Sequence, residues 1–191
     1  MVRSTASKEA LRARIGAVRR ALSPQTVRAA SKQIAERVVA LPEFSHARVV
    51  GCYLALGHEV QTMELVKRCW REDKEVCVPA FEDARRGYVL AWLKMGEATE
   101  TGPAKILQPK KIRPASPKAV DLMIVPAVAF DRSGRRLGHG GGHYDRLLAQ
   151  CPGFKVGVAF EAQMVEEVPS DIHDVGVDIV VTERRIYPLR G

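Results

Sequence analysis

The stretch Leu122-Met123-Ile124-Val125-Pro126 decides the fold. Downstream of it come Asp131 and a turn at Ser133-Gly134. The glycine-rich segment follows, Arg136-Leu137-Gly138-His139-Gly140-Gly141-Gly142-His143-Tyr144-Asp145. The first five residues are apolar without alternation, which is typical of a strand buried on both faces of a sheet. The glycines form a loop, and residues 144–151 predict a helix behind it. Strand, glycine loop and helix in this order indicate an open α/β sheet, in which ligands bind at the carboxyl ends of the strands.

Short β-branched runs recur on both sides of this stretch and predict further strands. The expected strands cover residues 47–54, 75–79, 88–93, 122–128, 155–160 and 177–182. A helix expected to begin at Thr62 separates the first two, so strands alternate with helices as in βαβ units. We therefore predict one α/β domain over residues 1–191, with a largely parallel sheet.

Two helices are expected ahead of the sheet, within residues 1–42. Ser7 precedes apolar residues at helical spacing, which predicts a capped amphipathic helix. Ser23-Pro24 predicts the start of a second helix, with serine as N-cap and proline at the first helical position. Pro42 is expected to end that helix, and residues 43–191 form the predicted core, with the glycine loop at residues 136–145.

The segment from Gly96 to Ala119 is rich in Lys, Pro, Gly and Thr. Its polarity argues against a place in the core. It is predicted to be a long surface loop or an active-site flap, and the flap is favoured.

The totals of the sequence restrict the class of protein. The 191 residues carry a net charge of +8, which favours polyanionic ligands such as nucleotides, nucleic acids or polycarboxylates without choosing among them. The four cysteines form no C-x-x-C pair, and a reducing cytoplasm fits them best. No apolar run approaches the ~20 residues that a membrane span requires, so export and membrane insertion are not expected.

The glycine loop is a candidate phosphate site. Successive backbone N–H groups of glycines can surround a phosphate, and Arg136 adds a fork of charged donors. The loop matches neither the Rossmann pattern, which needs glycine at His143, nor the P-loop, which needs Gly-Lys before Ser or Thr. A flexible connection without a ligand remains the alternative.

Each of three carboxylates, those of Asp145, Asp174 and Glu59, has two possible roles. Asp145, in the first turn of the helix after the loop, could hold Mg²⁺ beside phosphates or simply satisfy the helix dipole. Asp174 follows His173 in an acidic string without zinc spacing, which is more often a solvated turn than a metal cluster. Glu59 could bind amino groups of a ligand or cap the helix at Thr62.

Several motifs together resemble the 5-formyltetrahydrofolate cyclo-ligase (methenyltetrahydrofolate synthetase) family over nearly the whole chain. Lys8-x-x-Leu11-Arg12 is similar to the family's K-x-x-L-R, and Glu59-Val60-Gln61-Thr62 to E-[VI]-x-T. The block from Pro126 to Asp145 resembles P-x-x-x-F-D…R-L-G-x-G-x-G-Y-Y-D. The last third resembles G-x-A-[FY]-x-x-Q…P…H-D-x-x-[VL]-D…T-E, at Gly157 to Gln163, Pro169, His173-Asp174, Asp178 and Thr182-Glu183.

The resemblance implies a three-layer α/β/α fold like that of ribose-5-phosphate isomerase and CoA-transferase domains. It implies ATP-dependent cyclisation of 5-formyltetrahydrofolate to 5,10-methenyltetrahydrofolate with Mg²⁺, by a cytoplasmic monomer whose substrate carries or lacks a polyglutamate tail. It implies that Arg136, Tyr144 and Asp145 are catalytic residues and that Asp145 and Asp174 bind Mg²⁺. ATP is expected at Lys8, Glu9, Ala10, Leu11, Arg12, Arg136, Leu137, Gly138, His139, Gly140, Gly141, Gly142, His143 and Tyr144. The folate is expected at Leu54, Glu59, His139, Gly140, Gly141, Gly142, His143 and Tyr144.

Two departures from the family pattern leave alternatives open. His143 replaces the first Tyr of Y-Y-D, and Gln108-Pro109 stands where Glu-Pro is common. They favour, as a rival, a family-like protein that binds ATP or another phosphate without folate turnover. A basic nucleic-acid-binding module is a weaker alternative, because the basic residues are not interleaved with stacking aromatics.

Overall fold

The strand β7 (Leu122–Pro126) lies inside an eight-stranded sheet, as its unbroken apolar run predicts. The structure is a computed structural model that describes residues 2–82, 87–103 and 106–188. Leu122 and Ile124 pack into an apolar cluster on one face of the sheet, and Met123 and Val125 into a second cluster on the other. Because alternate residues of a strand point to opposite faces, β7 is buried from both sides.

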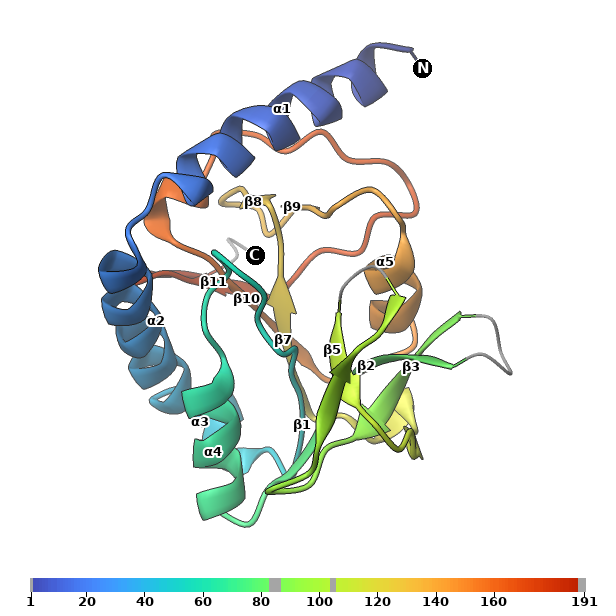
Figure 1. Cartoon of the computed structure of the whole chain (residues 1–191). Coiled ribbons are helices and arrows are strands. Elements are labelled where there is room, and N and C mark those ends of the chain that lie inside the picture. Colours follow the sequence, from blue (N-terminus) through green and yellow to red (C-terminus); the bar gives the residue numbers. More distant parts are fainter. Residues whose placement is uncertain (1, 83–86, 104–105, 189–191) are drawn as a thin grey trace.

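The remaining elements follow the chain in this order (Figure 1). They are α1 (Val2–Arg20), α2 (Pro24–Val39), α3 (Pro42–His46), β1 (Val49–Gly51), α4 (Met63–Arg71), β2 (Glu75–Glu82), β3 (Gly87–Trp92), β4 (Thr99–Thr101), β5 (Leu107–Pro109), β6 (Pro114–Ala115), η3 (Pro117–Ala119), then β7, β8 (Ala129–Phe130), β9 (Arg136–Leu137), α5 (His143–Leu148), β10 (Phe154–Val158), η4 (Glu161–Gln163), β11 (Ile179–Val181) and β12 (Ile186–Pro188).

The sheet has the order β12-β11-β10-β7-β1-β2-β3-β6. Its five central strands, from β11 to β2, pair in parallel. The strands β12 and β3 pair antiparallel with their inner neighbours, and β6 pairs antiparallel with β3. The predicted α/β class with a largely parallel sheet is confirmed.

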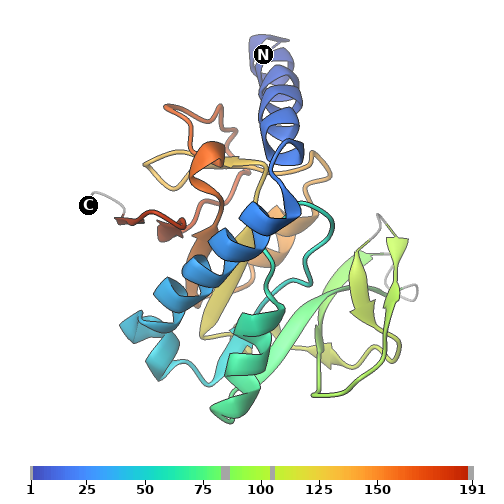
Figure 2. The same ribbon diagram turned by 60° about the vertical axis from the view of Figure 1, so that its left-hand side comes forward.

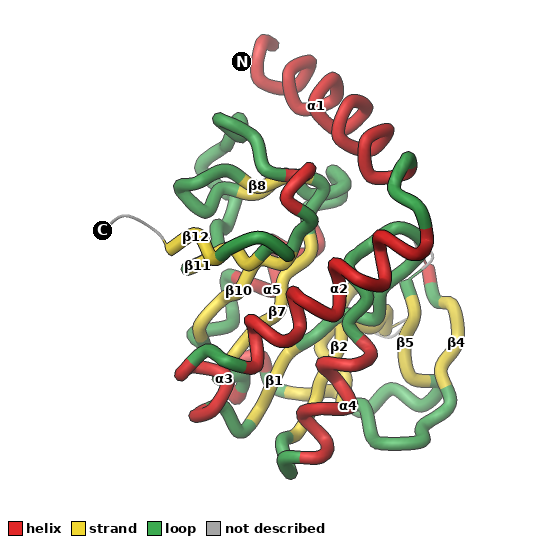
Figure 3. Tube along the Cα trace, turned by 90° about the vertical axis from the view of Figure 1, so that its left-hand side faces the viewer, coloured by secondary structure: helices red, strands yellow, loops and turns green. Residues whose placement is uncertain are grey.

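Helices cover both faces of the sheet. The helices α2, α3 and α4 cross one face in front of the strands (Figure 3), where Ile34, Phe44 and Val66 enter the first cluster. The helix α5 lies on the opposite face, where Leu147 and Leu148 enter the second cluster. The layers are therefore helix, sheet and helix.

Two expected helix boundaries are wrong. The helix α1 begins at Val2 and continues through Ser7, because no Gly or Pro interrupts residues 2–7 and a serine favours an N-cap without enforcing one. The helix α2 begins as predicted, with Ser23 Oγ accepting a hydrogen bond from Thr26 N at 3.1 Å. It ends at Val39, before Pro42, which instead occupies the first position of the unpredicted α3.

The segment from Gly96 to Ala119 is not an unstructured loop. Its described residues form the hairpin β4–β5, the edge strand β6 and the short 3-10 helix η3. Gln108 is buried there, where its Oε1 accepts a hydrogen bond from Phe81 N at 2.9 Å and its Nε2 donates to Glu100 Oε1 at 3.4 Å. The side-chain amide thus fastens the hairpin to the end of β2. This anchor was not predicted, because a single buried glutamine has no periodic signal, and the flap stays a prediction.

The helix α1 projects beyond the sheet and its other helices (Figure 2). Leu11 and Ile15 hold it against a small third cluster made by Val128, Ala129, Leu137 and Val168. Among the described residues, no helix combines the length and the apolar character that crossing a bilayer requires. The four cysteines are free and buried, and burial raises the pKa of Cys77 to about 12, so that this thiol behaves as an apolar group.

Candidate functional site

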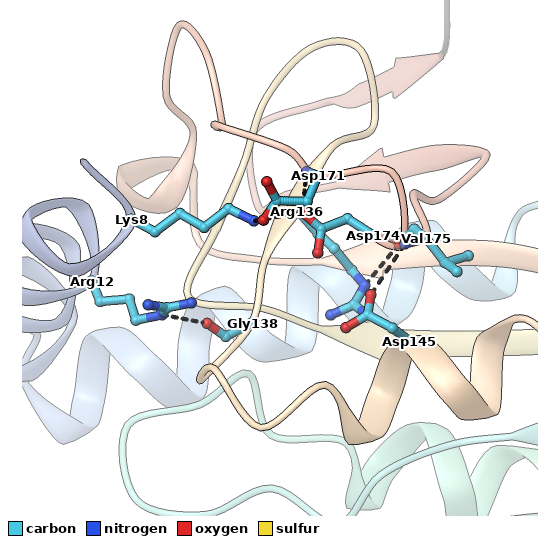
Figure 4. Close-up of polar contacts among 8 residues, drawn as sticks. All are labelled: Lys8, Arg12, Arg136, Gly138, Asp145, Asp171, Asp174 and Val175. Carbon is cyan, nitrogen blue, oxygen red and sulfur yellow. Dashed lines mark hydrogen bonds and ion pairs between the residues drawn. The ribbon is translucent and has the colours of Figure 1, made fainter. Parts of the chain in front are cut away.

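A buried junction joins the glycine loop to α5 and to the chain before β11. Arg136, in β9, donates from Nη2 to Asp145 Oδ1 at 2.5 Å and from Nε to Val175 O at 2.9 Å. Val175 N donates to the same Asp145 oxygen at 3.1 Å (Figure 4). The Arg136 side chain is only 3% exposed, against 23% for Asp145. The two predicted site residues therefore lie together, with Asp145 paired to a fixed cation.

Lys8 reaches from α1 to the acidic turn, which we define as residues 170–176. Its Nζ lies 2.6 Å from Asp174 Oδ2 and 2.7 Å from Asp171 Oδ2. Burial acts to lower the pKa of Lys8, but the hydrogen bonds to both carboxylates outweigh it and raise the pKa above its ordinary value. Burial acts in the opposite sense on Asp174, whose pKa is nevertheless lowered by the hydrogen bonds from Lys8 and from Asp171 N. The interaction holds both groups charged.

Arg12, one turn further along α1, contacts the glycine loop. Its Nε donates to Gly138 O at 2.9 Å, and a Cβ placed on Gly140 would lie 3.5 Å from its guanidinium. Gly140 and Gly142 have φ values of 102° and 63°, which lie in the region that favours glycine. The loop thus brings exposed backbone close to Arg12, which is the arrangement that a phosphate cradle needs.

The helix after the loop is shorter than the sequence predicts. The helix α5 has six residues, and the predicted helix has eight, up to Cys151. A short helix aligns few peptide dipoles, so its amino end provides a weak field. The basic side chains that lie against the loop are Arg12 and Arg136.

Glu59 lies near the glycine loop, beside His139. Its Oε1 is 3.8 Å from His139 Nε2, and its Oε2 accepts a hydrogen bond from Leu56 N at 2.9 Å. Glu59 therefore supports the turn before it, and the alternative that it caps α4 is wrong. Leu54 is buried in the first apolar cluster, so its role toward a ligand stays a prediction.

Tyr144 has a buried hydroxyl group for which the described residues provide no hydrogen-bond partner. Its ring lies beside Arg136, with 5.9 Å from the ring centroid to Cζ. Burial, supplemented by nearby groups that include Glu59, raises the pKa of Tyr144 well above its ordinary value. A buried hydroxyl without a partner costs free energy, which a polar atom of a ligand would recover. The side chain of His143, at the start of α5, lies outside the described part of the structure.

Asp131, a buried carboxylate to which the sequence analysis assigned no role, supports the chain on both sides of the glycine loop. It accepts hydrogen bonds from Ser133 N at 2.9 Å, from Arg135 Nε at 2.8 Å and from Val168 N at 2.9 Å. Burial acts to raise the pKa of Asp131, but these hydrogen bonds lower it below its ordinary value. The turn motif around Ser133-Gly134 signalled the local bend, whereas the bond to Val168, 37 positions away, left no local signal.

Among the described residues, no three His, Cys, Asp or Glu side chains gather in a way that could hold a metal ion by themselves. His173 is exposed on the acidic turn and belongs to no such group among the described residues. Asp145 and Asp174 are each paired to a basic side chain, and both lie around Arg136 in Figure 4. A cation that uses them would need ligands from a bound molecule.

A model of the 5-formyltetrahydrofolate cyclo-ligase family matches residues 4–183. The chain belongs to this family. A relative named 5-formyltetrahydrofolate cyclo-ligase from Escherichia coli K12 is 34% identical over 176 residues, which cover 88% of this chain and 96% of the relative. The expected resemblance is confirmed.

Solved structures agree with the family assignment. The NMR structure of 5,10-methenyltetrahydrofolate synthetase from Aquifex aeolicus is similar with a TM-score of 0.86 and 34% identity, over 96% of this chain and 93% of that one. A synthetase from Mycoplasma pneumoniae is similar in fold, with a TM-score of 0.74 at 22% identity, over 92% of this chain and 98% of that one. The overall fold of this chain is therefore shared with solved methenyltetrahydrofolate synthetases.

Proposed function

We propose that the protein catalyses the ATP-dependent cyclisation of 5-formyltetrahydrofolate to 5,10-methenyltetrahydrofolate, with release of ADP and phosphate. The observation that carries the proposal is that Arg12 and Arg136 flank one glycine loop and that Lys8 reaches the acidic turn to which Arg136 is bonded. Beside them lies the Tyr144 hydroxyl, which has no partner among the described residues. Basic side chains and free backbone N–H groups suit phosphates, and the buried hydroxyl and Glu59 suit the polar edge of a folate.

The reaction asks the protein for alignment and charge neutralisation. The formyl oxygen of the substrate attacks the γ-phosphate of ATP, so that ADP leaves and an activated iminium phosphate forms. The amine at position 10 then attacks the formyl carbon, which closes the ring, and phosphate leaves as the amine's proton is released to solvent. No covalent nucleophile on the protein takes part, which fits a site built from basic side chains and loop backbone.

Each basic side chain has a defined place in this scheme. Arg12, hydrogen-bonded to Gly138 O, would neutralise negative charge that develops on the transferred phosphoryl group. Arg136 would orient phosphate, and its hydrogen bond to Val175 O would hold it in place when Asp145 gives its carboxylate to Mg²⁺. The Tyr144 hydroxyl would donate a hydrogen bond to the bound folate. Because burial keeps this phenol protonated, it acts as a donor and not as a base.

Asp145 and Asp174 would hold Mg²⁺. Their carboxylate oxygens are the hard ligands that this cation prefers, and Mg²⁺ commonly binds one or two carboxylates and completes its shell with phosphates and water. The two carboxylates therefore fit the ion without a third protein ligand. When bound, Mg²⁺ supplies neutralisation of the phosphate charge.

The test is the growth of methenyl-folate absorbance when purified protein receives 5-formyltetrahydrofolate, MgATP or both. We expect absorbance to grow only with both, and Asp145→Asn to abolish turnover while its circular dichroism matches the parent. Glu166→Gln, an exposed carboxylate on the segment before the acidic turn, is the matched control and should retain the parental rate. A folded parent that binds ATP and forms no methenyl-folate would contradict the proposal.

That outcome would favour the rival, a family-like protein that binds ATP without folate turnover. The structure weakens one reason for the rival. Gln108 is buried, with both ends of its amide engaged by Phe81 and Glu100, so its departure from the family's usual glutamate has a structural use. A monomeric state, a polyglutamylated substrate and a cytoplasmic location remain predictions.

A further inference from the structure

The acidic turn offers Lys8 two carboxylates of different exposure. The Asp171 side chain is 60% exposed and the Asp174 side chain 27%, while Lys8 itself is 11% exposed. Asp171 thus lies on the outer side of the ammonium group. Asp174 lies toward Arg136, whose charge contributes to lowering its pKa.

The turn is held at its base and at its tip. At the base, Val168 N donates to Asp131 Oδ2 at 2.9 Å and Val177 N donates to Gly134 O at 3.0 Å. Within the turn, Asp171 N donates to Asp174 Oδ2 at 2.7 Å. Lys8 then draws both carboxylates toward α1. Because the base is fixed independently, the turn can keep its shape if one of the two ion pairs is broken.

Binding of a cation breaks one of them. Under the function proposed above, Asp174 gives its carboxylate to Mg²⁺ when MgATP binds. Asp174 Oδ2 already accepts hydrogen bonds from Lys8 and from Asp171 N, so a cation that binds this carboxylate competes with the ammonium group for its negative charge and displaces it. The remaining anion within reach of Lys8 on the turn is Asp171, at 2.7 Å.

We propose that Asp171 is a positioning residue that keeps Lys8 at the nucleotide site once the cation has taken Asp174. The inference rests on the proposed function, and it assigns each carboxylate of the turn a separate task. Asp174 exchanges a lysine for a cation when ligand binds. Asp171 keeps its lysine throughout, so the ammonium group stays directed at the phosphates instead of moving into solvent.

The test measures the affinity for ATP by calorimetry in excess Mg²⁺ and, separately, in EDTA, without folate. Asp171→Asn should raise the Kd for ATP about fivefold in Mg²⁺, as expected for one partly exposed ion pair, and less than about twofold in EDTA, where Asp174 still holds Lys8. Asp171→Glu should restore most of the affinity, and Glu166→Gln should leave it unchanged in both conditions. A purely structural role would weaken binding equally with and without Mg²⁺.

A second arm asks whether Asp171 acts through Lys8. In a Lys8→Met background, the exchange Asp171→Asn should add no further loss of affinity in Mg²⁺. Equal losses in Mg²⁺ and EDTA, or an undiminished loss in the Lys8→Met background, would overturn the role of Asp171 while leaving the proposed function intact. A parent that binds no MgATP would instead overturn the proposed function and this inference together.

Discussion

Replacing Arg136 with methionine should destabilise the whole protein as well as weaken ATP binding. Methionine fills much of the volume of arginine but removes its charge and its donors. In the parent, the guanidinium donates to Asp145 Oδ1 at 2.5 Å and to Val175 O at 2.9 Å, in a site where the arginine side chain is 3% exposed. The variant therefore leaves a carboxylate and a carbonyl without their charged donor.

The size of the effect follows from these two contacts. A hydrogen bond from a charged donor to a carbonyl contributes about 1.5–3 kcal/mol. Loss of the ion pair to Asp145 adds about 1–2 kcal/mol. This cost is smaller than that of losing a fully buried pair, because water reaches the 23% exposed carboxylate. The free energy of unfolding should fall by about 2.5–5 kcal/mol, and for a chain of this length the melting temperature by about 10 °C.

Thermal unfolding followed by circular dichroism measures this change, with urea unfolding as a check. Arg136→Lys is the matched variant, since it keeps the charge but loses the fork of donors, and it should recover only part of the stability. In an Asp145→Asn background, Arg136→Met should cost at least about 1 kcal/mol less than in the parent. A melting temperature that falls by less than about 2 °C would refute the assignment of this junction as a structural anchor of the site.

Two further changes test the surrounding framework. Asp131→Asn should destabilise the protein at neutral pH; because the folded-state pKa of Asp131 is lowered, the difference from the parent should be full above the ordinary carboxyl value of about 4 and shrink as the pH falls below it. Urea unfolding between neutral and acidic pH measures this, and a difference independent of pH would show that the carboxylate charge is not responsible. Gly142→Ala should cost about 1–2 kcal/mol, because Gly142 has φ 63° and no atom within 4 Å of an added Cβ, which leaves backbone strain as the cause. Gly142→Asn should recover part of that loss in the same unfolding experiment, and equal stabilities of Gly142→Ala and the parent would contradict the strain argument.

The sequence predicts those parts of the fold that depend on neighbouring residues. The apolar run of β7 and the Ser23-Pro24 start of α2 both carry strong local signals, and both predictions are confirmed. The two-residue strands β8 and β9 are too short to show any periodicity. The hairpin β4–β5 is hidden by its polar composition, because its buried polar anchor, Gln108, acts through a contact with Phe81.

The candidate site shows the same division. Its glycine loop, Arg136 and Asp145 lie within ten residues of one another, so the sequence places them in one site. Lys8 was expected at the nucleotide, but its pairing with Asp171 spans 163 positions and cannot be read from either neighbourhood. The pairing of Asp171 with Lys8 therefore depends on a contact that only the folded chain creates, between α1 and the acidic turn.

The attachment of α1 through its own small apolar cluster has a thermodynamic consequence. Leu11 and Ile15 hold the helix there, while Lys8 and Arg12 on the same helix complete the site. Docking of α1 and binding of ligand are then linked equilibria, and the apparent affinity equals the intrinsic affinity multiplied by the fraction of molecules with α1 docked. Changes at Ile15, which is not among the residues expected at the nucleotide, would in this way tune substrate affinity, and a bound nucleotide would in return stabilise the first helix of the chain.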